Sequence, residues 1–191
     1  MTTGTLTSVM GPMYAGKTSE LMKRILWLNH LALSVMVIKP AIDDRYSKNR
    51  EIVTHTGHKF ECHYLFLDKI DQDKIANDNL VLQDASKMHS VFVDEIQFFD
   101  SEIISIIEEW LTSGVDVVVS GLDQDSTGAP FLTSAQLLAM SDEVVKLKSY
   151  CNTCGQPATK TQKLFDTGKQ IDVGSSGMYE ARCLKHWQPR K

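Results

Sequence analysis

The stretch "GPMYAGKTSE", residues 11–20, decides the fold because its spacing is that of a loop that holds nucleotide phosphates. Gly11, Gly16, Lys17 and Thr18 fit the pattern G-x-x-x-x-G-K-[ST]. The glycines let several backbone N–H groups point at one anion, and the helix start that follows adds its positive dipole end. The lysine supplies a charge for the outer phosphates, and the threonine hydroxyl suits Mg²⁺. The alternative is an ordinary glycine-containing turn, which the position between a strand pattern and a helix pattern disfavours.

Strand and helix patterns alternate on both sides of this loop. Short apolar, β-forming runs are separated by segments with a 3.6-residue apolar period, which predicts an α/β fold: a parallel sheet with helices on both faces. The run "SVFVDE" is apolar on both faces, as a central parallel strand should be. Residues 41–61 are polar with few periodic cues, and 62–88 are ambiguous. The expected strands are 6–10, 34–40, 90–95, 115–123 and 143–150, and the expected helices are 17–31, 133–140 and one from Asp100 or Ser101 to Gly114.

The composition is that of an ordinary globular protein. The 191 residues are 42% hydrophobic and 23% charged, so a sizeable core can be buried. A net charge of −4 and a pI near 5.8 disfavour a nucleic-acid partner, which normally requires a basic domain. No apolar run approaches the roughly 18 residues needed to span a bilayer, and the first residues lack the features of a signal peptide. We therefore expect a cytoplasmic protein without membrane contact.

Two carboxylates, Asp94 and Glu95, end the apolar run 90–93. In phosphate-loop folds an aspartate at such a strand end faces the Mg²⁺, whereas the alternative is a solvated loop start. Adjacent side chains of a strand point in different directions, so one carboxylate can serve the metal while Glu95 takes a proton from an attacking hydroxyl. Phe98 and Phe99 follow, and they either wall a flat substrate or belong to the core.

The chain changes character after Tyr150, where cysteines, glycines and threonines replace the long helical patterns. Two pairs of residues have zinc-ligand spacing: Cys151 with Cys154, and Cys183 with His186. The second pair favours a structural Cys₃His site over a redox C-x-x-C or unrelated thiols, and such a closed site would anchor a long loop. We expect a nucleotide-binding α/β domain over 1–149 and a zinc-binding lid subdomain over 150–191.

Together these motifs resemble those of the type II, thymidine kinase 1-like, thymidine kinases. The match consists of the GPM phosphate loop, the D-E-x-Q-F-F strand end, "LD…PF" within 122–131 and the late cysteine and histidine pairs. The resemblance covers nearly the whole chain and is least clear over 62–88. It implies a P-loop, RecA-like domain with a zinc-bound lasso subdomain, and usually a homotetramer. It also implies transfer of the γ-phosphate of ATP to the 5′-hydroxyl of deoxythymidine, a reaction of nucleotide salvage.

The resemblance also implies roles for individual residues. Glu95 would be the general base, Asp94 would hold the Walker B position, Asp43 would hold Mg²⁺ through water, and Arg45 would lie near the phosphates. Nucleotide contacts are implied for Gly11, Pro12, Met13, Tyr14, Ala15, Gly16, Lys17, Thr18 and Gln97. Nucleoside contacts are implied for Met13, Phe98, Leu122, Phe131, Thr161, Ile171, Asp172, Val173, Gly174, Ser175 and Tyr179. The implied metals are a catalytic Mg²⁺ and a structural Zn²⁺.

One departure from the family pattern concerns the nucleoside site. The family commonly has Phe-Arg within "LD-x-D-F-R-G-x-PF", where this chain has Ser126 and Thr127. An aromatic contact contributes about 0.5–1.5 kcal/mol beyond area burial. We therefore expect weaker or broader nucleoside selection unless another side chain fills the gap. Four further residues have no assigned role: Cys62, His55, His58 and His63.

Two other functions fit parts of the sequence. A zinc ribbon on the same core is typical of an ATP-dependent nucleic-acid-binding protein, and the tail has basic residues at Lys185, Arg190 and Lys191. The acidic total and the lack of clustered basic and aromatic residues disfavour it. A GTPase switch is disfavoured because the sequence has no N-K-x-D guanine motif.

Overall fold

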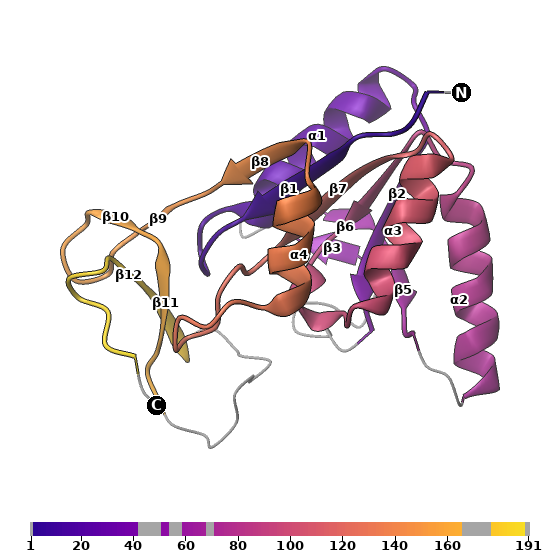
Figure 1. Ribbon diagram of the computed structural model, residues 1–191. Coiled ribbons are helices and arrows are strands. Elements are labelled where there is room, and N and C mark those ends of the chain that lie inside the picture. The colour runs from indigo at the N-terminus through magenta and orange to yellow at the C-terminus, as the bar shows by residue number, and fades with distance from the viewer. Residues whose placement is uncertain (1, 42–50, 54–58, 68–70, 166–176, 190–191) are drawn as a thin grey trace.

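A six-stranded parallel sheet lies at the centre of the computed structural model, which describes residues 2–41, 51–53, 59–67, 71–165 and 177–189. The strands run in the order β5-β2-β6-β7-β1-β8 (Figure 1). Their bounds are β1 Leu6–Met10, β2 Val35–Pro40, β5 His63–Leu65, β6 Ser90–Val93, β7 Asp116–Gly121 and β8 Glu143–Lys146. Because the paired strands are parallel, their carboxyl ends meet at one edge of the sheet, where such folds bind ligands.

Side chains alternate between the two faces of the sheet along each strand. Leu6 and Met10 belong to the core on one face, and Val9 belongs to the core on the other. The first core is covered by α2 (Gln72–Ala85), α3 (Glu102–Thr112) and α4 (Leu132–Met140). The second is covered by α1 (Lys17–His30) and by the hairpin of β3 (Glu51–Val53) and β4 (Lys59–Glu61). The predicted α/β fold with helices on both faces is confirmed.

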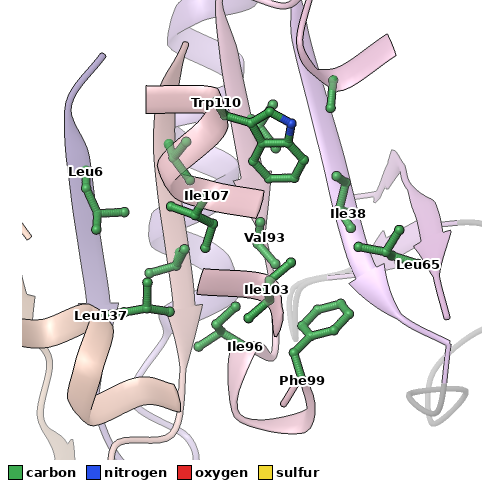
Figure 2. Close-up of a cluster of buried hydrophobic side chains, with 14 of the residues drawn as sticks. Leu6, Ile38, Leu65, Val93, Ile96, Phe99, Ile103, Ile107, Trp110 and Leu137 are labelled. Atoms are coloured by element: carbon green, nitrogen blue, oxygen red, sulfur yellow. The ribbon is translucent and has the colours of Figure 1, made fainter. Parts of the chain in front are cut away.

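The helix α3 shows how local sequence and packing combine. Its apolar stripe, formed by Ile103, Ile107 and Trp110, lies in the same core as Val93 of the sheet (Figure 2). Full burial of such a side chain contributes roughly 1.5–3 kcal/mol. The Asp100 carboxylate accepts a hydrogen bond from Glu102 N (3.0 Å), so the capping side chain is that of Asp100 and not that of Ser101.

The predicted strand 143–150 is in fact two strands. β8 ends at Lys146, and β9 (Ser149–Tyr150) pairs instead with β10 (Pro157–Ala158) outside the central sheet. The chain leaves the sheet where its neighbour β1 ends, directly after the hydrogen bond from Leu147 N to Met10 O (2.8 Å). A run of β-forming residues does not show how long the neighbouring strand is. The length of the strand that begins at residue 143 was therefore overestimated from the sequence.

The ambiguous segment 62–88 contains β5 and α2. Its helical period is obscured because Asp78 is buried on the inner side of α2. The Asp78 carboxylate accepts hydrogen bonds from Phe66 N (3.0 Å) and Leu67 N (2.7 Å), which stabilises the turn after β5. The start of α2 does have a local signal in the sequence, because Asp71 caps the helix by accepting a hydrogen bond from Asp73 N (3.1 Å).

The described residues from Ser149 to Pro189 form what we call the C-terminal strand group. In this group β9 pairs with β10, and β11 (Lys160–Lys163) pairs with β12 (Tyr179–Arg182), away from the main sheet (Figure 1). Its buried apolar cluster is small and consists of Cys151, Ala158 and Ala181. Across the described part of the chain, the helices are too short or too polar to cross a bilayer.

Candidate active site

The phosphate loop connects β1 to α1 at the carboxyl edge of the sheet. Gly16 precedes the first helical residue with a φ of 82°, a left-handed conformation that favours glycine. Because Gly16 has no side chain to cap the helix, the first amides of α1 remain suited to an anion. The Lys17 ammonium lies over the loop and donates to Pro12 O (2.9 Å). This geometry is that of a site for phosphate groups.

Thr18 and Asp94 come together beside this loop, although 76 positions separate them in the sequence. Thr18 Oγ1 donates to Asp94 Oδ2 (3.2 Å), and the Ser120 hydroxyl donates to Asp94 Oδ1. Neighbouring ligands of an octahedral Mg²⁺ with bonds of 2.0–2.1 Å lie about 3 Å apart. The hydroxyl and the carboxylate, both hard oxygen ligands, therefore fit Mg²⁺ in type and in separation.

Burial and the neighbouring Glu95 raise the pKa of Asp94 from 3.8 to about 6, against hydrogen bonds from Ser120 and Glu95 N and the charge of Lys39. Asp94 is 3% exposed and Lys39 is 5% exposed. The sequence reasoning missed Lys39 and Ser120. A lysine inside the apolar run "VMVIKP" was a usable signal, because lysine is rarely buried without an electrostatic partner.

We expect the ionised Asp94 to cost the ligand-free protein stability above pH 6. Its folded pKa lies above its ordinary value, so the native state binds more protons and stability falls as pH rises between about 4 and 6. The variant Asp94→Asn cannot ionise there, and at pH 8 its free energy of unfolding should exceed that of the native chain by about 1–3 kcal/mol. Urea unfolding at pH 8 and near pH 4 measures the gain, which should shrink at the lower pH.

A matched control for this experiment is Asp84→Asn, which changes an exposed carboxylate on α2. It should alter stability little at either pH. An Asp94→Asn protein that is less stable than the native chain at pH 8 would contradict the expectation.

Glu95 follows Asp94 and begins a short 3₁₀ helix, η1 (Ile96–Phe98). Its φ of 54° is unusual for a residue other than glycine. The two adjacent carboxylates have different partners, since Asp94 accepts from Ser120 and Glu95 accepts from Gln97. Gln97, which the resemblance assigned to the nucleotide, is 6% exposed and hydrogen-bonded to Glu95 and to Leu122 N. Its predicted contact with the nucleotide stays a prediction.

The aromatic residues after β6 have different surroundings. Phe99 is 6% exposed and packs in the core beside Ile96 and Ile103 (Figure 2). Of the two alternatives for this residue, the structure therefore supports the core. Phe98 is half-buried at the carboxyl edge of the sheet. Leu122, after β7, is also half-buried, and its carbonyl accepts from Ser134 Oγ (2.7 Å).

The C-terminal strand group contacts the phosphate loop directly. Met13 N donates to Thr161 Oγ1 (3.1 Å), and Ser149 Oγ donates to Tyr14 O (3.1 Å). Tyr179 pairs with Lys163 on the β11–β12 hairpin and is buried. The structure thus brings Thr161 to the loop. Other predicted site residues lie outside the described residues: Asp43, Arg45, Ile171, Asp172, Val173, Gly174 and Ser175, as do His55 and His58.

The four predicted zinc ligands form one cluster. Their ligand atoms lie within 4.8 Å of one another. Cys154 Sγ lies 3.8 Å from Cys183 Sγ, and His186 Nδ1 lies 3.7 Å from Cys151 Sγ and 3.3 Å from Cys183 Sγ. A tetrahedral zinc with Zn–S bonds near 2.3 Å has sulfur atoms about 3.8 Å apart. The donor set and its spacing therefore fit a zinc ion.

A phosphate loop at the carboxyl edge of a parallel sheet, with an aspartate beside it, defines a nucleotide-binding α/β protein of the P-loop class. Comparison with known proteins narrows the class. The family model described as thymidine kinase matches residues 4–187. The thymidine kinase of Thermococcus kodakarensis is 36% identical over 190 residues, which covers 96% of this chain and 93% of that protein. The chain belongs to the thymidine kinase family, and this disfavours the nucleic-acid-binding alternative.

Two solved structures match about three quarters of this chain. A DNA replication initiation factor is 12% identical, with a TM-score of 0.48 and coverage of 75% of this chain and 40% of that chain. The genome packaging NTPase B204 from Sulfolobus turreted icosahedral virus 2, in complex with sulfate, is 16% identical, with a TM-score of 0.45 and coverage of 78% and 76%. Both TM-scores are below 0.5, and we base no conclusion on them.

Proposed function

We propose that this chain is an ATP:thymidine 5′-phosphotransferase, which transfers the γ-phosphate of ATP to deoxythymidine in nucleotide salvage. Membership of the thymidine kinase family supports the reaction. The observation that carries it is the approach of Asp94 to Thr18 (3.2 Å), because this contact puts the acidic end of β6 beside the phosphate loop. A base next to the terminal phosphate is what phosphoryl transfer to a hydroxyl needs.

The chemistry then follows from the positions of a few residues. Backbone amides later in the loop, such as those of Ala15 and Gly16, and the Lys17 ammonium would hold the phosphates of ATP. Thr18 and Asp94 would hold Mg²⁺, which would neutralise phosphate charge. Glu95 accepts the proton of the 5′-hydroxyl as its oxygen bonds to the γ-phosphorus. The bond from that phosphorus to the bridging oxygen breaks, and ADP leaves with the electron pair.

The nucleoside site is proposed between the sheet edge and the C-terminal strand group. Half-buried apolar side chains at that edge, Met13, Phe98, Leu122 and Phe131, would contact the nucleoside. Thr161 and Tyr179 would contact it from the other side, together with residues 171–175. Exclusion of water by such a lid favours transfer to the sugar hydroxyl over hydrolysis.

The remaining parts of the proposal come from the sequence patterns and from the family resemblance. Residues 1–149 would form the nucleotide-binding domain, and residues 150–191 would form a lid that a structural zinc anchors. Asp43 and Arg45 would contribute to the Mg²⁺ and phosphate contacts, and the enzyme would be a cytoplasmic homotetramer. Light scattering at several protein concentrations tests the assembly.

A direct assay tests the proposed function. The protein is incubated with labelled ATP, Mg²⁺ and each natural deoxynucleoside, and the products are separated. We expect deoxythymidine monophosphate. ATP hydrolysis that DNA stimulates, with no nucleoside monophosphate formed, would instead favour the nucleic-acid-binding function.

The variant Ser126→Phe should sharpen nucleoside selection. Ser126 is half-buried in a turn that Asp125 stabilises by accepting hydrogen bonds from Thr127 N (2.8 Å) and Ala129 N (3.0 Å), so a larger side chain leaves these contacts intact. An added aromatic contact should raise kcat/KM for deoxythymidine about 2- to 10-fold and raise the preference over deoxycytidine. The control is Ala139→Phe, which adds an aromatic ring at an exposed site on α4. Unchanged specificity constants in Ser126→Phe would contradict the expectation.

A further inference from the structure

Gln97 connects two parts of the site through one buried side chain. Its Nε2 donates to Glu95 Oε2, and its Oε1 accepts from Leu122 N at 2.9 Å. With 6% of its surface exposed, the side chain is nearly closed off from solvent. Both ends of the amide are therefore used inside the protein.

The orientation of this amide follows from its partners. The backbone N–H of Leu122 can only donate, so the carbonyl oxygen of Gln97 must face it and the NH₂ group must face Glu95. An NH₂ group needs an acceptor, and an ionised carboxylate oxygen is a strong one. Gln97 therefore fixes the direction of the Glu95 side chain.

The backbone around Gln97 is shaped to allow this contact. A Cβ atom on Gly121 would lie 2.4 Å from Gln97 Oε1 and 2.8 Å from Ile96 Cγ2. Only glycine at this position lets the 3₁₀ turn that carries Gln97 pack against the end of β7. On the other side, Glu95 has a φ of 54°, a strained conformation that surrounding contacts must maintain.

We propose, on the basis of the proposed function, that Gln97 is a positioning residue for the base Glu95. It aligns the carboxylate with the acceptor hydroxyl, and it ties that alignment to the backbone of Leu122, where the proposed nucleoside contacts begin. This role differs from the nucleotide contact that the resemblance implies for Gln97, because it acts on turnover and leaves ATP affinity alone.

The test is a double-mutant cycle on the full-length enzyme. Gln97→Met keeps the size of the side chain but makes neither hydrogen bond, and it should lower kcat about 10- to 100-fold. The KM for ATP should change by less than about 3-fold, since the lost interaction orients a base. In a Glu95→Ala background the same substitution should lower kcat no further, because the group it positions is gone. Gln136→Met, at an exposed site on α4, is the matched control and should leave kcat unchanged.

Several outcomes separate this inference from its alternatives. Losses that add in the double variant would show that Gln97 acts independently of Glu95 and would overturn the inference. A KM for ATP that rises with little change in kcat would show that Gln97 acts on the nucleotide and would overturn it as well. If Gln97→Met fails to fold, Gln97→Glu decides, because it keeps the acceptor for Leu122 N and replaces the donor with a like charge. Native kcat in Gln97→Glu overturns the inference, and a loss supports it. A native enzyme that forms no monophosphate refutes the proposed function instead.

Discussion

Replacement of Glu95 by glutamine should reduce the turnover of thymidine phosphorylation about 10²- to 10⁴-fold, the contribution typical of a general base. The substitution keeps the shape of the side chain and an oxygen that accepts from Gln97. It removes the ability to take up the proton of the 5′-hydroxyl. ATP binding should persist, because the phosphate loop and the contact between Thr18 and Asp94 are unchanged. Steady-state kinetics with deoxythymidine and titration of ATP binding measure the two effects separately.

A suitable control for Glu95→Gln is Glu108→Gln, which removes an exposed carboxylate on α3 far along the chain from the phosphate loop. It should leave both kcat and ATP affinity unchanged. Near-native turnover in Glu95→Gln would remove Glu95 from the role of base. Loss of ATP binding along with turnover would show that the residue supports the nucleotide site itself.

The parts of this protein that could be predicted from the sequence are those that local spacing encodes. The phosphate loop is contiguous, so its motif, the strand before it and the helix after it were all readable from residues 6–31. The stripe of α3 was readable for the same reason. The cysteine and histidine pairs were also recognisable, since each pair is local even though 28 residues lie between them, and the structure brings both pairs into one cluster.

What escaped prediction depends on contacts between distant segments. The hydrogen bonds of Ser120 to Asp94 and of Gln97 to Leu122 join segments that lie far apart in the sequence, and they have no local signature. The buried Lys39 could be noticed in its apolar run, but the sequence does not show that it lies near Asp94. The segment that contains α2 stayed ambiguous because Asp78 interrupts the apolar face of the helix, where its carboxylate accepts hydrogen bonds from Phe66 N and Leu67 N. In each case a polar residue in the interior has a partner that only the fold can reveal.

Removal of the metal from the C-terminal strand group should have an effect as large as the loss of Glu95. The buried cluster of this group contains only Cys151, Ala158 and Ala181 in the described chain, too little apolar area to stabilise it alone. Structural zinc contributes about 10–16 kcal/mol of apparent binding free energy in small zinc domains. We therefore expect one zinc per chain, and we expect Cys183→Ala or a strong chelator to unfold this group while the central sheet stays folded.

Loss of the zinc should also disturb the phosphate loop and thereby reduce activity. Thr161 accepts from Met13 N (3.1 Å) and Ser149 donates to Tyr14 O (3.1 Å), so an unfolded C-terminal strand group releases the loop as well as the proposed lid. We expect kcat/KM for deoxythymidine to fall about 100-fold or more, because the acceptor is no longer held in place. ATP affinity should fall less, since Lys17 and the first turn of α1 remain. Metal analysis, hydrogen exchange and kinetics measure the three effects, with Cys62→Ala, outside the cluster, as the control that keeps its zinc. Freshly prepared, fully active protein without bound metal would show that the four side chains hold this part of the chain together by packing alone.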